Sequence, residues 1–436
     1  MFGKRKVAPL QATAFEATGE NDSSVRLFSP DSADPGTQVI VRRSAVEAVR
    51  ADPGAHDLVH AVVDFVNSML GHGCYGRDEI SQKALQVYHA DYYLAQVNNG
   101  GHSQFIRNCG GNAPFIWADA SAGLEAMGAA NHADLLARMI EWAETHPEEA
   151  AGQTGFDGGR AGALDELDTA FYAAEKETPM IRLSTRWILG WPELCITEDA
   201  DFHQAVDCLA FLNPMRGERM IANRVRSFEH QINNWLHAAI GMAATAAPET
   251  EVRLHIGGGA MMNVEGEQAM VWSLQTNKGR RFARVTDAGA QLFECVEADN
   301  PPMPDIGDTE GMLKAVKDGR MAMFKPPLVG PCLSCVEAEQ IAEAIQYGNR
   351  FNAAAAFDMM LRKMGDESES VPVSAIGASR DDDGIVTVRW IIATADQPFV
   401  ALVTARGTKL FRPGEKMPVV SLSADDIAEH AEAYAG

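Results

Sequence analysis

The spacing of apolar residues changes along the chain. From about residue 37 to Pro214 apolar residues recur at three- and four-residue steps, which is typical of amphipathic helices. Beyond Pro248 much of the chain places them at every second position, which is typical of strands with one buried face. Residues 1–36 are rich in Ser, Asp, Gly and Pro and follow neither period, so we interpret them as a loose arm.

Signals for single elements refine this pattern. Residues 37–42 predict a short strand, and Ser81 predicts the start of a helix that runs to about Val97. A longer amphipathic helix is predicted from Arg216 to Ala247, before Pro248. The following residues predict strands at 270–274, 282–285 and 291–293, a helix at 336–364, strands at 385–394, 399–404 and 408–411, and a last helix capped by Ser423.

The predicted strands contain a repeat. A shift of 118 residues aligns Trp272 with Trp390 and Gly289 with Gly407, and it gives nine identities over residues 266–293 without a gap. We interpret this register as an internal duplication. The alternative is that two unrelated short hairpins have similar sequences because both use the residue types that are common in strands.

These patterns together predict the fold class α + (α+β). An all-helical N-terminal domain would be followed by a tandemly duplicated helix-plus-antiparallel-sheet region with pseudo-twofold symmetry. The predicted parts are a loose arm at 1–36, a helical domain at 37–214, a first α+β copy at 215–330 and a second copy at 331–436.

Charge indicates the kind of partner. The chain has 37 Lys and Arg residues against 60 Asp and Glu residues, a formal net charge of −23, so a nucleic-acid phosphate surface would repel it and basic proteins would attract it. Between Glu141 and Ala210 fifteen residues are acidic and four are basic. A merely solvated surface is the alternative. The candidate partner-binding carboxylates, around a Gly-rich loop, are Glu141, Glu144, Glu148, Glu149, Asp157, Asp165, Glu166 and Asp168.

The most distinctive local sequence lies between Asp91 and Asn108. Asn98, Asn99, Gly100 and Gly101 tolerate the left-handed conformation that ends a helix, so they predict a turn into a second, short helix. Gln104 and Asn108 are four residues apart and share a face, where their amides could bond the backbone groups that the turn leaves open. We interpret these six residues as structural.

The same residues carry a family resemblance. The segments 97–101, 104–105 and 124–129, with Leu167-Asp168 and Phe171-Tyr172, resemble the signature of the DNA-mimic protein family over about residues 84–172. His102 stands where relatives often carry an aromatic residue. The resemblance implies an acidic helical domain, often dimeric, whose carboxylates imitate DNA phosphates and occupy the basic face of a DNA-binding regulator or histone-like protein.

Other candidate chemistry is weaker. His56, His60 and Asp64 form a stripe with the spacing of a zinc hydrolase motif, but on a helical wheel this stripe lies opposite the apolar face. Cys332 and Cys335 precede a predicted helix, whose N-terminal dipole would lower a thiol pKa, yet no second pair completes a zinc site. The sequence shows neither a phosphate-binding loop nor a nucleophile elbow.

We therefore expect a non-enzymatic acidic interaction protein, without metal or cofactor, that binds a basic and DNA-binding protein; a homodimer stays open. One alternative is an immunity or antitoxin-like protein, and another is a metal-dependent hydrolase using His56, His60 and Asp64. The odd count of seven cysteines, the lack of an export signal after the basic first residues and the lack of an apolar span predict a cytoplasmic location.

Overall fold

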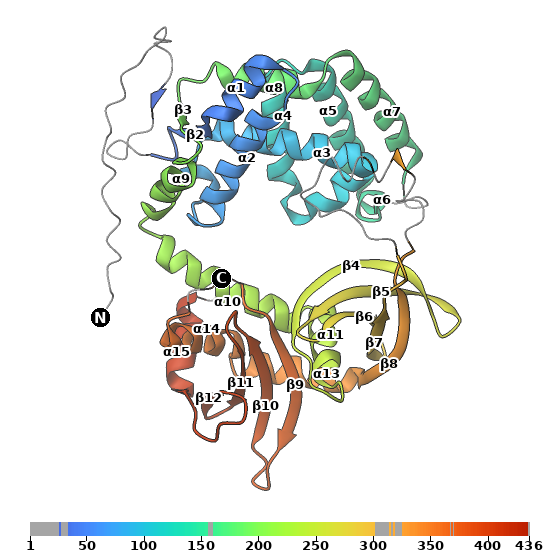
Figure 1. The fold of residues 1–436 in the computed structure, drawn as a ribbon, viewed down its shortest axis with the longest axis vertical. Helices are drawn as coiled ribbons and strands as arrows, with labels where there is room; N and C mark the ends of the chain where they lie inside the picture. The colour runs from blue at the N-terminus through green and yellow to red at the C-terminus, as the bar shows by residue number, and fades with distance from the viewer. Residues whose placement is uncertain are drawn as a thin grey trace. The chain divides into compact units, whose positions relative to one another are not determined.

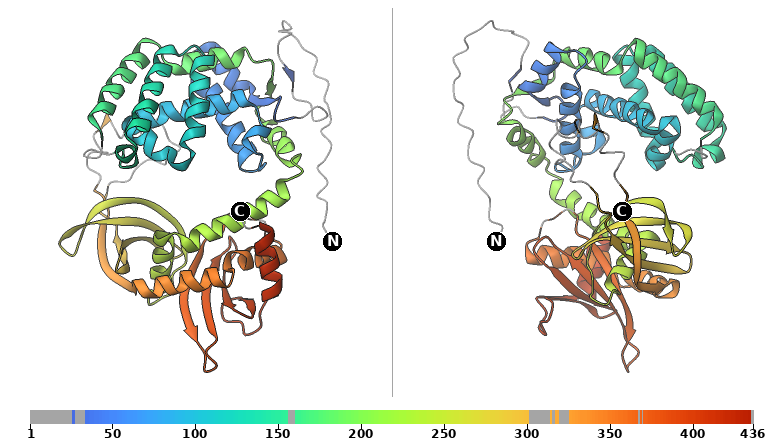
Figure 2. Two further views of the ribbon diagram at one scale, coloured as in Figure 1. Left: turned by 180° about the vertical axis from the view of Figure 1, so that it is seen from behind. Right: turned by 45° about the vertical axis from the view of Figure 1, so that its right-hand side comes forward.

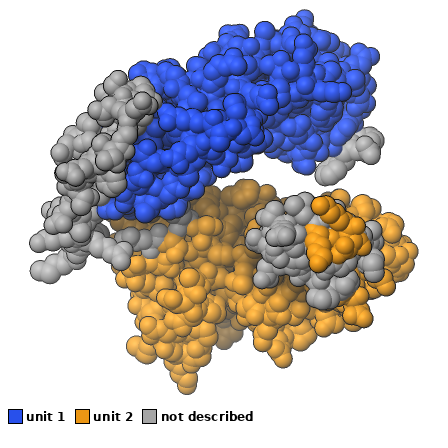
Figure 3. All heavy atoms as spheres, turned by 45° about the horizontal axis from the view of Figure 1, so that its top comes forward, with its two compact units in different colours: residues 1–216 blue, residues 217–436 orange. Residues whose placement is uncertain are grey.

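The computed structural model describes residues 26–27, 34–155, 160–300, 314, 317–318, 325–366, 368 and 370–434. The chain forms two compact units, residues 1–216 and residues 217–436, which are coloured separately in Figure 3. Each unit has its own hydrophobic core.

The first unit is a helical region, as its apolar spacing predicts (Figure 1). Ser81 begins α3 as expected, because its hydroxyl accepts a hydrogen bond from the Ala84 backbone N–H at 3.3 Å. The helices are α1 (Arg43–Ala51), α2 (Asp57–Leu70), α3 (Gln82–Cys109), α4 (Ala113–Ala126), α5 (Ala130–Thr145), α6 (Pro147–Ala151), α7 (Gly162–Glu177), α8 (Met180–Leu189) and α9 (Phe202–Phe211).

A small parallel sheet corrects the description of this region as all-helical. β1 (Arg26–Leu27), β3 (Leu194–Thr197) and β2 (Val39–Arg42) pair in the order β1-β3-β2. The strand predicted at 37–42 is confirmed as β2. β3 was not predicted, and β1 lies in the segment interpreted as a loose arm.

The second unit begins with two helices and a five-stranded antiparallel sheet. The single helix predicted over 216–247 is wrong: α10 (Arg216–Asn233) and α11 (Trp235–Thr245) are separated at Asn234, whose side chain caps α11 by accepting from the His237 N–H. The sheet order is β4-β5-β6-β7-β8, and Figure 1 shows it curving around α11. Its strands are β4 (Arg253–Val264), β5 (Glu267–Thr276), β6 (Gly279–Thr286), β7 (Gly289–Val296) and β8 (Leu328–Glu337).

The same order of elements follows a second time. The predicted helix at 336–364 is again two helices, α13 (Ala338–Arg350) and α14 (Ala353–Met364), because Asn352 between them is left-handed with φ of 51°. The second sheet is also antiparallel, with the order β13-β12-β11-β10-β9. Its elements are β9 (Val373–Arg380), β10 (Val386–Ala393), β11 (Pro398–Thr404), β12 (Gly407–Phe411), β13 (Val420–Ser423) and the last helix α15 (Ala424–Tyr434).

Strand pairing among β5, β6 and β7 and among β10, β11 and β12 follows the shift of 118 residues. Trp272 pairs with Ala283 in the first sheet, and Trp390 pairs with Ala401 in the second. The last strand ends directly before a helix in each case, at Glu337 and at Ser423. A boundary between the copies at residues 330 and 331 would therefore cut β8.

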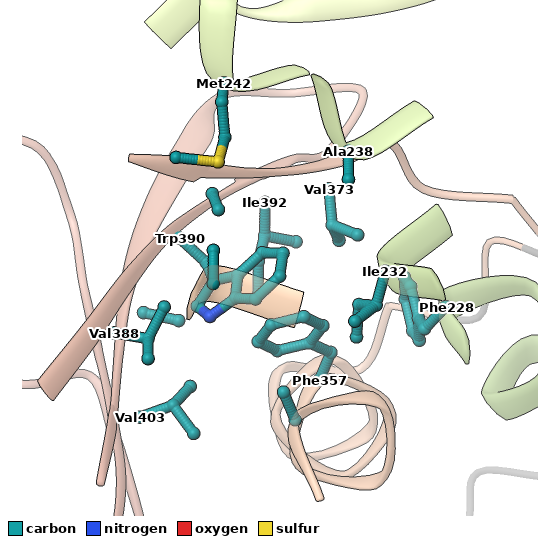
Figure 4. Close-up of a cluster of buried hydrophobic side chains, with 14 of the residues drawn as sticks. Phe228, Ile232, Ala238, Met242, Phe357, Val373, Val388, Trp390, Ile392 and Val403 are labelled. Atoms are coloured by element: carbon teal, nitrogen blue, oxygen red, sulfur yellow. The ribbon is translucent and has the colours of Figure 1, made fainter. Parts of the chain in front are cut away.

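The two sheets and their helices share one core. Phe357 of α14 packs edge-on against Phe228 of α10 at 5.7 Å between ring centroids, and against Trp390 of β10 at 5.5 Å (Figure 4). All three side chains are buried. The antiparallel sheets with covering helices that the sequence predicts for this half are thus confirmed.

Candidate protein-binding site

A break in α3 organises the centre of the first unit. Gly100 (φ −153°) and Gly101 (φ 75°) have non-helical backbone angles, so the predicted turn between two helical segments is confirmed. A side chain at Gly101 would be unfavourable for two reasons: φ is in the left-handed region, and a Cβ would overlap Asp168 Oδ2 on α7. The glycine thus allows α7 to approach the broken helix closely.

Asp168 binds the residue that follows this break. Its Oδ1 accepts the backbone N–H of His102 at 2.8 Å and lies 2.6 Å from His102 Nδ1. The hydroxyl of Tyr93 lies 2.8 Å from the other ring nitrogen of His102. His102 and Tyr93 are fully buried and Asp168 is 6% exposed, so the three side chains form an internal clamp between α3 and α7.

The carboxylate of Asp168 fixes the direction of the first hydrogen bond, and the tautomer of His102 gives the direction of the second. An ionised carboxylate only accepts, so Nδ1 of His102 donates to Asp168, and in the tautomer with its one proton on Nδ1 the Nε2 atom accepts from the Tyr93 hydroxyl. Burial first, and then the charges of Asp168 and Glu175, raise the pKa of Tyr93 well above its usual range, which keeps this hydroxyl protonated. Groups this deeply buried are out of reach of a substrate, so we interpret the clamp as a structural feature that attaches α7 to α3.

The amides of the motif bond each other. Gln96 Oε1 accepts from Gln104 Nε2 at 2.8 Å and from Asn108 Nδ2 at 2.6 Å, and Asn99 Nδ2 donates to Gln104 Oε1 at 3.1 Å. The expectation that Gln104 and Asn108 satisfy the open backbone groups is therefore not met. One of these backbone groups, the Gly100 carbonyl, instead accepts a hydrogen bond from the Arg160 guanidinium at 2.9 Å.

The clamp was not predicted, although one signal for it is present. Asp168 lies in the apolar stripe of α7, between Leu164, Leu167 and Phe171 at helical spacing. A carboxylate on a buried helix face needs a partner. The partner, His102, is 66 residues away in the chain, and only the tertiary structure brings it close.

Exposed carboxylates lie on α7, which the clamp holds, and on the neighbouring helices α5 and α6. Glu141 and Glu144 lie on α5, Glu148 and Glu149 in the first turn of α6, and Asp165 and Glu166 on α7. All six residues are exposed, and we call them the acidic face. In Figure 2 the three helices α3, α5 and α7 can be followed from two further directions.

Two of the candidate carboxylates do not belong to this face. Asp168 is buried in the clamp, and Asp157 lies outside the described residues. Within the part of the chain that the structure describes, none of the six carboxylates of the acidic face forms an ion pair. Their negative charges are therefore not neutralised locally.

Other acidic residues of this unit behave differently. Glu193 pairs with Lys83 at 2.9 Å and Glu198 with Arg43 at 2.6 Å, while Asp119 pairs with Arg77. These carboxylates hold structural elements together. The absence of such partners among the described residues around the acidic face leaves its carboxylates available to an external cation.

The residues of the hydrolase alternative do not assemble. His56 and His60 are exposed neighbours on or next to α2, with ring centroids 5.5 Å apart. Asp64 pairs with Arg42 at 3.7 Å and lines a pocket of about 530 Å³ with it. Across the described residues no three His, Cys, Asp or Glu side chains are placed to hold a metal ion, so geometry gives this alternative no support.

The geometry thus defines a helical module with a buried clamp between α3 and α7 and with exposed carboxylates on α5, α6 and α7 that form no ion pair among the described residues. Residues 78–190, a segment that contains the α3 break, the clamp and the acidic face, match the family model described as DMP19-like protein. The resemblance inferred from the motif is confirmed for this segment. No curated protein and no solved structure matches the chain. None of its described helices combines the length and apolar character needed to cross a membrane.

Proposed function

We propose that the chain is a non-enzymatic DNA-mimic-like protein whose acidic face binds the DNA-contacting surface of a basic protein. The observation that carries the proposal is the set of six exposed carboxylates, without ion pairs among the described residues, within the segment that matches the DMP19-like family. The partner class is a DNA-binding regulator or a histone-like protein.

Electrostatics supports the choice of partner. A row of carboxylates attracts Lys and Arg side chains that otherwise contact phosphates, and such charge complementarity speeds encounter and selects basic partners. Side chains three apart on a helix, such as Glu141 and Glu144, lie about 5–6 Å from each other. This spacing allows two basic side chains of one partner to be bound together.

The clamp supports the same proposal through rigidity. Asp165 and Glu166 belong to the helix that Asp168 attaches to α3. A surface whose charges are held in place loses less conformational entropy on binding than a flexible one. Asp168 therefore contributes to binding through the position of α7, and its own carboxylate does not meet the partner.

The experiment is affinity capture from lysate at low and at high salt, with mass spectrometry of the captured proteins. The wild-type chain should retain a basic DNA-binding protein at low salt and release it at high salt, because screening shortens the range of surface charges. The quadruple variant Glu148→Lys, Glu149→Lys, Asp165→Lys and Glu166→Lys should retain none. Capture that is insensitive to salt and to these changes would contradict the proposal.

The identity of the captured protein also distinguishes the DNA-mimic hypothesis from the immunity or antitoxin-like hypothesis. A regulator or histone-like protein that releases DNA on capture supports mimicry. A toxin whose active face is covered would support the immunity or antitoxin-like alternative.

We also propose that the second unit is an internal duplication that adds a second binding surface. The equivalent pairing of Trp272 with Ala283 and of Trp390 with Ala401 supports the duplication. Met261 and Leu328, which are 60% and 62% exposed, line a pocket of about 360 Å³ on the first sheet and support the surface. Capture experiments with the quadruple variant, whose acidic face is reversed, would test whether the second unit retains a partner of its own.

A further inference from the structure

Two cysteines on β8 bring their sulfur atoms into contact, in the unit that does not carry the acidic face. The Sγ atoms of Cys332 and Cys335 lie 3.5 Å apart, and both residues are exposed. The remaining cysteines, at 74, 109, 195, 208 and 295, are buried or half-buried. A sulfur–sulfur bond is about 2.0 Å long, so an approach of roughly 1.5 Å would join the two side chains.

A β-bulge places the two thiols on one side of the strand. Leu292 of β7 faces Ser334, while the next residue, Phe293, faces Cys332, so Leu333 is an extra residue in β8. In a regular strand, residues three apart point to opposite faces. The extra residue cancels that alternation and brings Cys332 to the side of Cys335.

One of the two residues between the cysteines, Ser334, is held in place by a hydrogen bond. The hydroxyl of Ser334 donates to the Ala243 carbonyl of α11 at 2.6 Å. This bond attaches the bulge to the helix that the sheet surrounds. The contact between the two thiols is thus part of the packed fold of the second unit.

We propose that Cys332 and Cys335 are a redox-active dithiol that closes to an intrachain disulfide by exchange with a small-molecule disulfide of the oxidised glutathione type. In the first step the Cys335 thiolate attacks one sulfur of the small disulfide, whose bond breaks and releases one small thiol. In the second step the Cys332 thiolate attacks the Cys335 sulfur of the mixed disulfide and releases the second small thiol. The two electrons and two protons lost by the protein end on these two thiols.

The environment of Cys332 supports this order. Burial first, and then the hydrogen bond and charge of Cys335, raise the pKa of Cys332 to about 11, so the lowered thiol pKa expected from a following helix is wrong for this residue. Cys332 keeps its proton at neutral pH, and the first attack falls to Cys335. Capping of Cys335 removes its charge from beside Cys332, and the distance of 3.5 Å between the two sulfur atoms allows the thiolate fraction of Cys332 to complete the exchange.

The test uses the full reduced chain and oxidised glutathione at neutral pH, followed by acid quenching, thiol alkylation and tryptic mapping. Residues 321–350 form one tryptic peptide that contains Cys332, Cys335 and no other cysteine. This peptide should lose two hydrogens and take no alkyl label, while peptides with Cys208 and Cys295 stay labelled. Dithiothreitol should restore both labels. A peptide that keeps both labels, keeps a stable glutathione adduct, or is linked between chains would overturn the proposal.

Single variants test the order of the two steps. Cys332→Ser should accumulate a stable glutathione adduct on Cys335, whereas Cys335→Ser should stay largely unmodified at the same pH. Cys295→Ser, on the neighbouring strand β7, is the matched control and should close the disulfide as the wild type does. An adduct that accumulates only in Cys335→Ser would overturn the assigned order.

Discussion

Replacement of Asp168 by alanine tests whether the clamp holds α7 on α3. The change removes the acceptor of two buried donors, the backbone N–H and the ring Nδ1–H of His102. Each buried donor left without a partner costs about 1–3 kcal/mol, so the loss of the acceptor of two donors costs about 2–6 kcal/mol. We expect α7 to lose about 3–4 kcal/mol of docking free energy.

Hydrogen exchange of the full chain measures this loss locally. Since about 1.4 kcal/mol corresponds to a tenfold change in an opening equilibrium, amides of α3 around His102 and of α7 should exchange roughly 10²–10³ times faster in Asp168→Ala. Amides of the second unit should be unchanged, which separates this effect from global unfolding.

A matched control lies on the same helix. Glu166 is exposed and lies two residues before Asp168 on α7. Glu166→Ala should therefore change the free energy of local opening by less than about 0.5 kcal/mol. Asp168→Asn keeps the shape and one acceptor, and should give an intermediate loss. Equal protection in Asp168→Ala and Glu166→Ala would refute the clamp.

Three further predictions concern the second unit. Asp358 is fully buried and its Oδ1 lies 2.5 Å from Arg224 Nε, so Asp358→Ala should destabilise this unit by about 3–5 kcal/mol in urea unfolding, as an uncompensated buried charge requires. Burial, with Arg253 and His230 nearby, lowers the pKa of His237 from 6.5 to about 4. Between pH 4 and 6.5 the His237 side chain binds a proton in the unfolded chain but not in the folded one, so the free energy of unfolding should fall as pH falls from 6.5 to 4. His237→Gln should remove this contribution to the pH dependence of stability. Gly289 and Gly407 have φ of 138° and 131°, and a Cβ at either position would overlap a carbonyl oxygen of the next strand. Gly289→Ala and Gly407→Ala should therefore each lower the melting temperature. An unchanged melting temperature in one of the two variants would argue against equivalent copies.

Local chemistry allowed parts of this structure to be predicted. Asn and Gly at 98–101 identify the break in α3 because few other residues adopt the left-handed backbone seen at Gly101. Alternation of apolar residues identifies the antiparallel strands, because one face of each sheet is buried. The family motif identifies the segment that matches the DMP19-like model.

Other parts depend on contacts distant in sequence or on single residues. The amphipathic period continues across Asn234 and Asn352, so the one-residue break between α10 and α11 and the two-residue break between α13 and α14 leave no gap in the pattern. Asp168 looks like another acidic residue until the structure places it beside His102. The contact between Cys332 and Cys335 requires a bulge that no local pattern marks.

Displacement of DNA tests the central claim most directly. Fluorescent duplex DNA bound to the captured basic protein is titrated with the wild-type chain, with the Glu148→Lys, Glu149→Lys, Asp165→Lys and Glu166→Lys variant, and with Glu249→Lys, which changes an exposed carboxylate of the second unit. We predict that the wild type and Glu249→Lys release the DNA with equal efficiency, that the quadruple variant does not, and that release weakens as salt rises. Release by the quadruple variant at wild-type concentrations would show that the acidic face does not act as a DNA mimic.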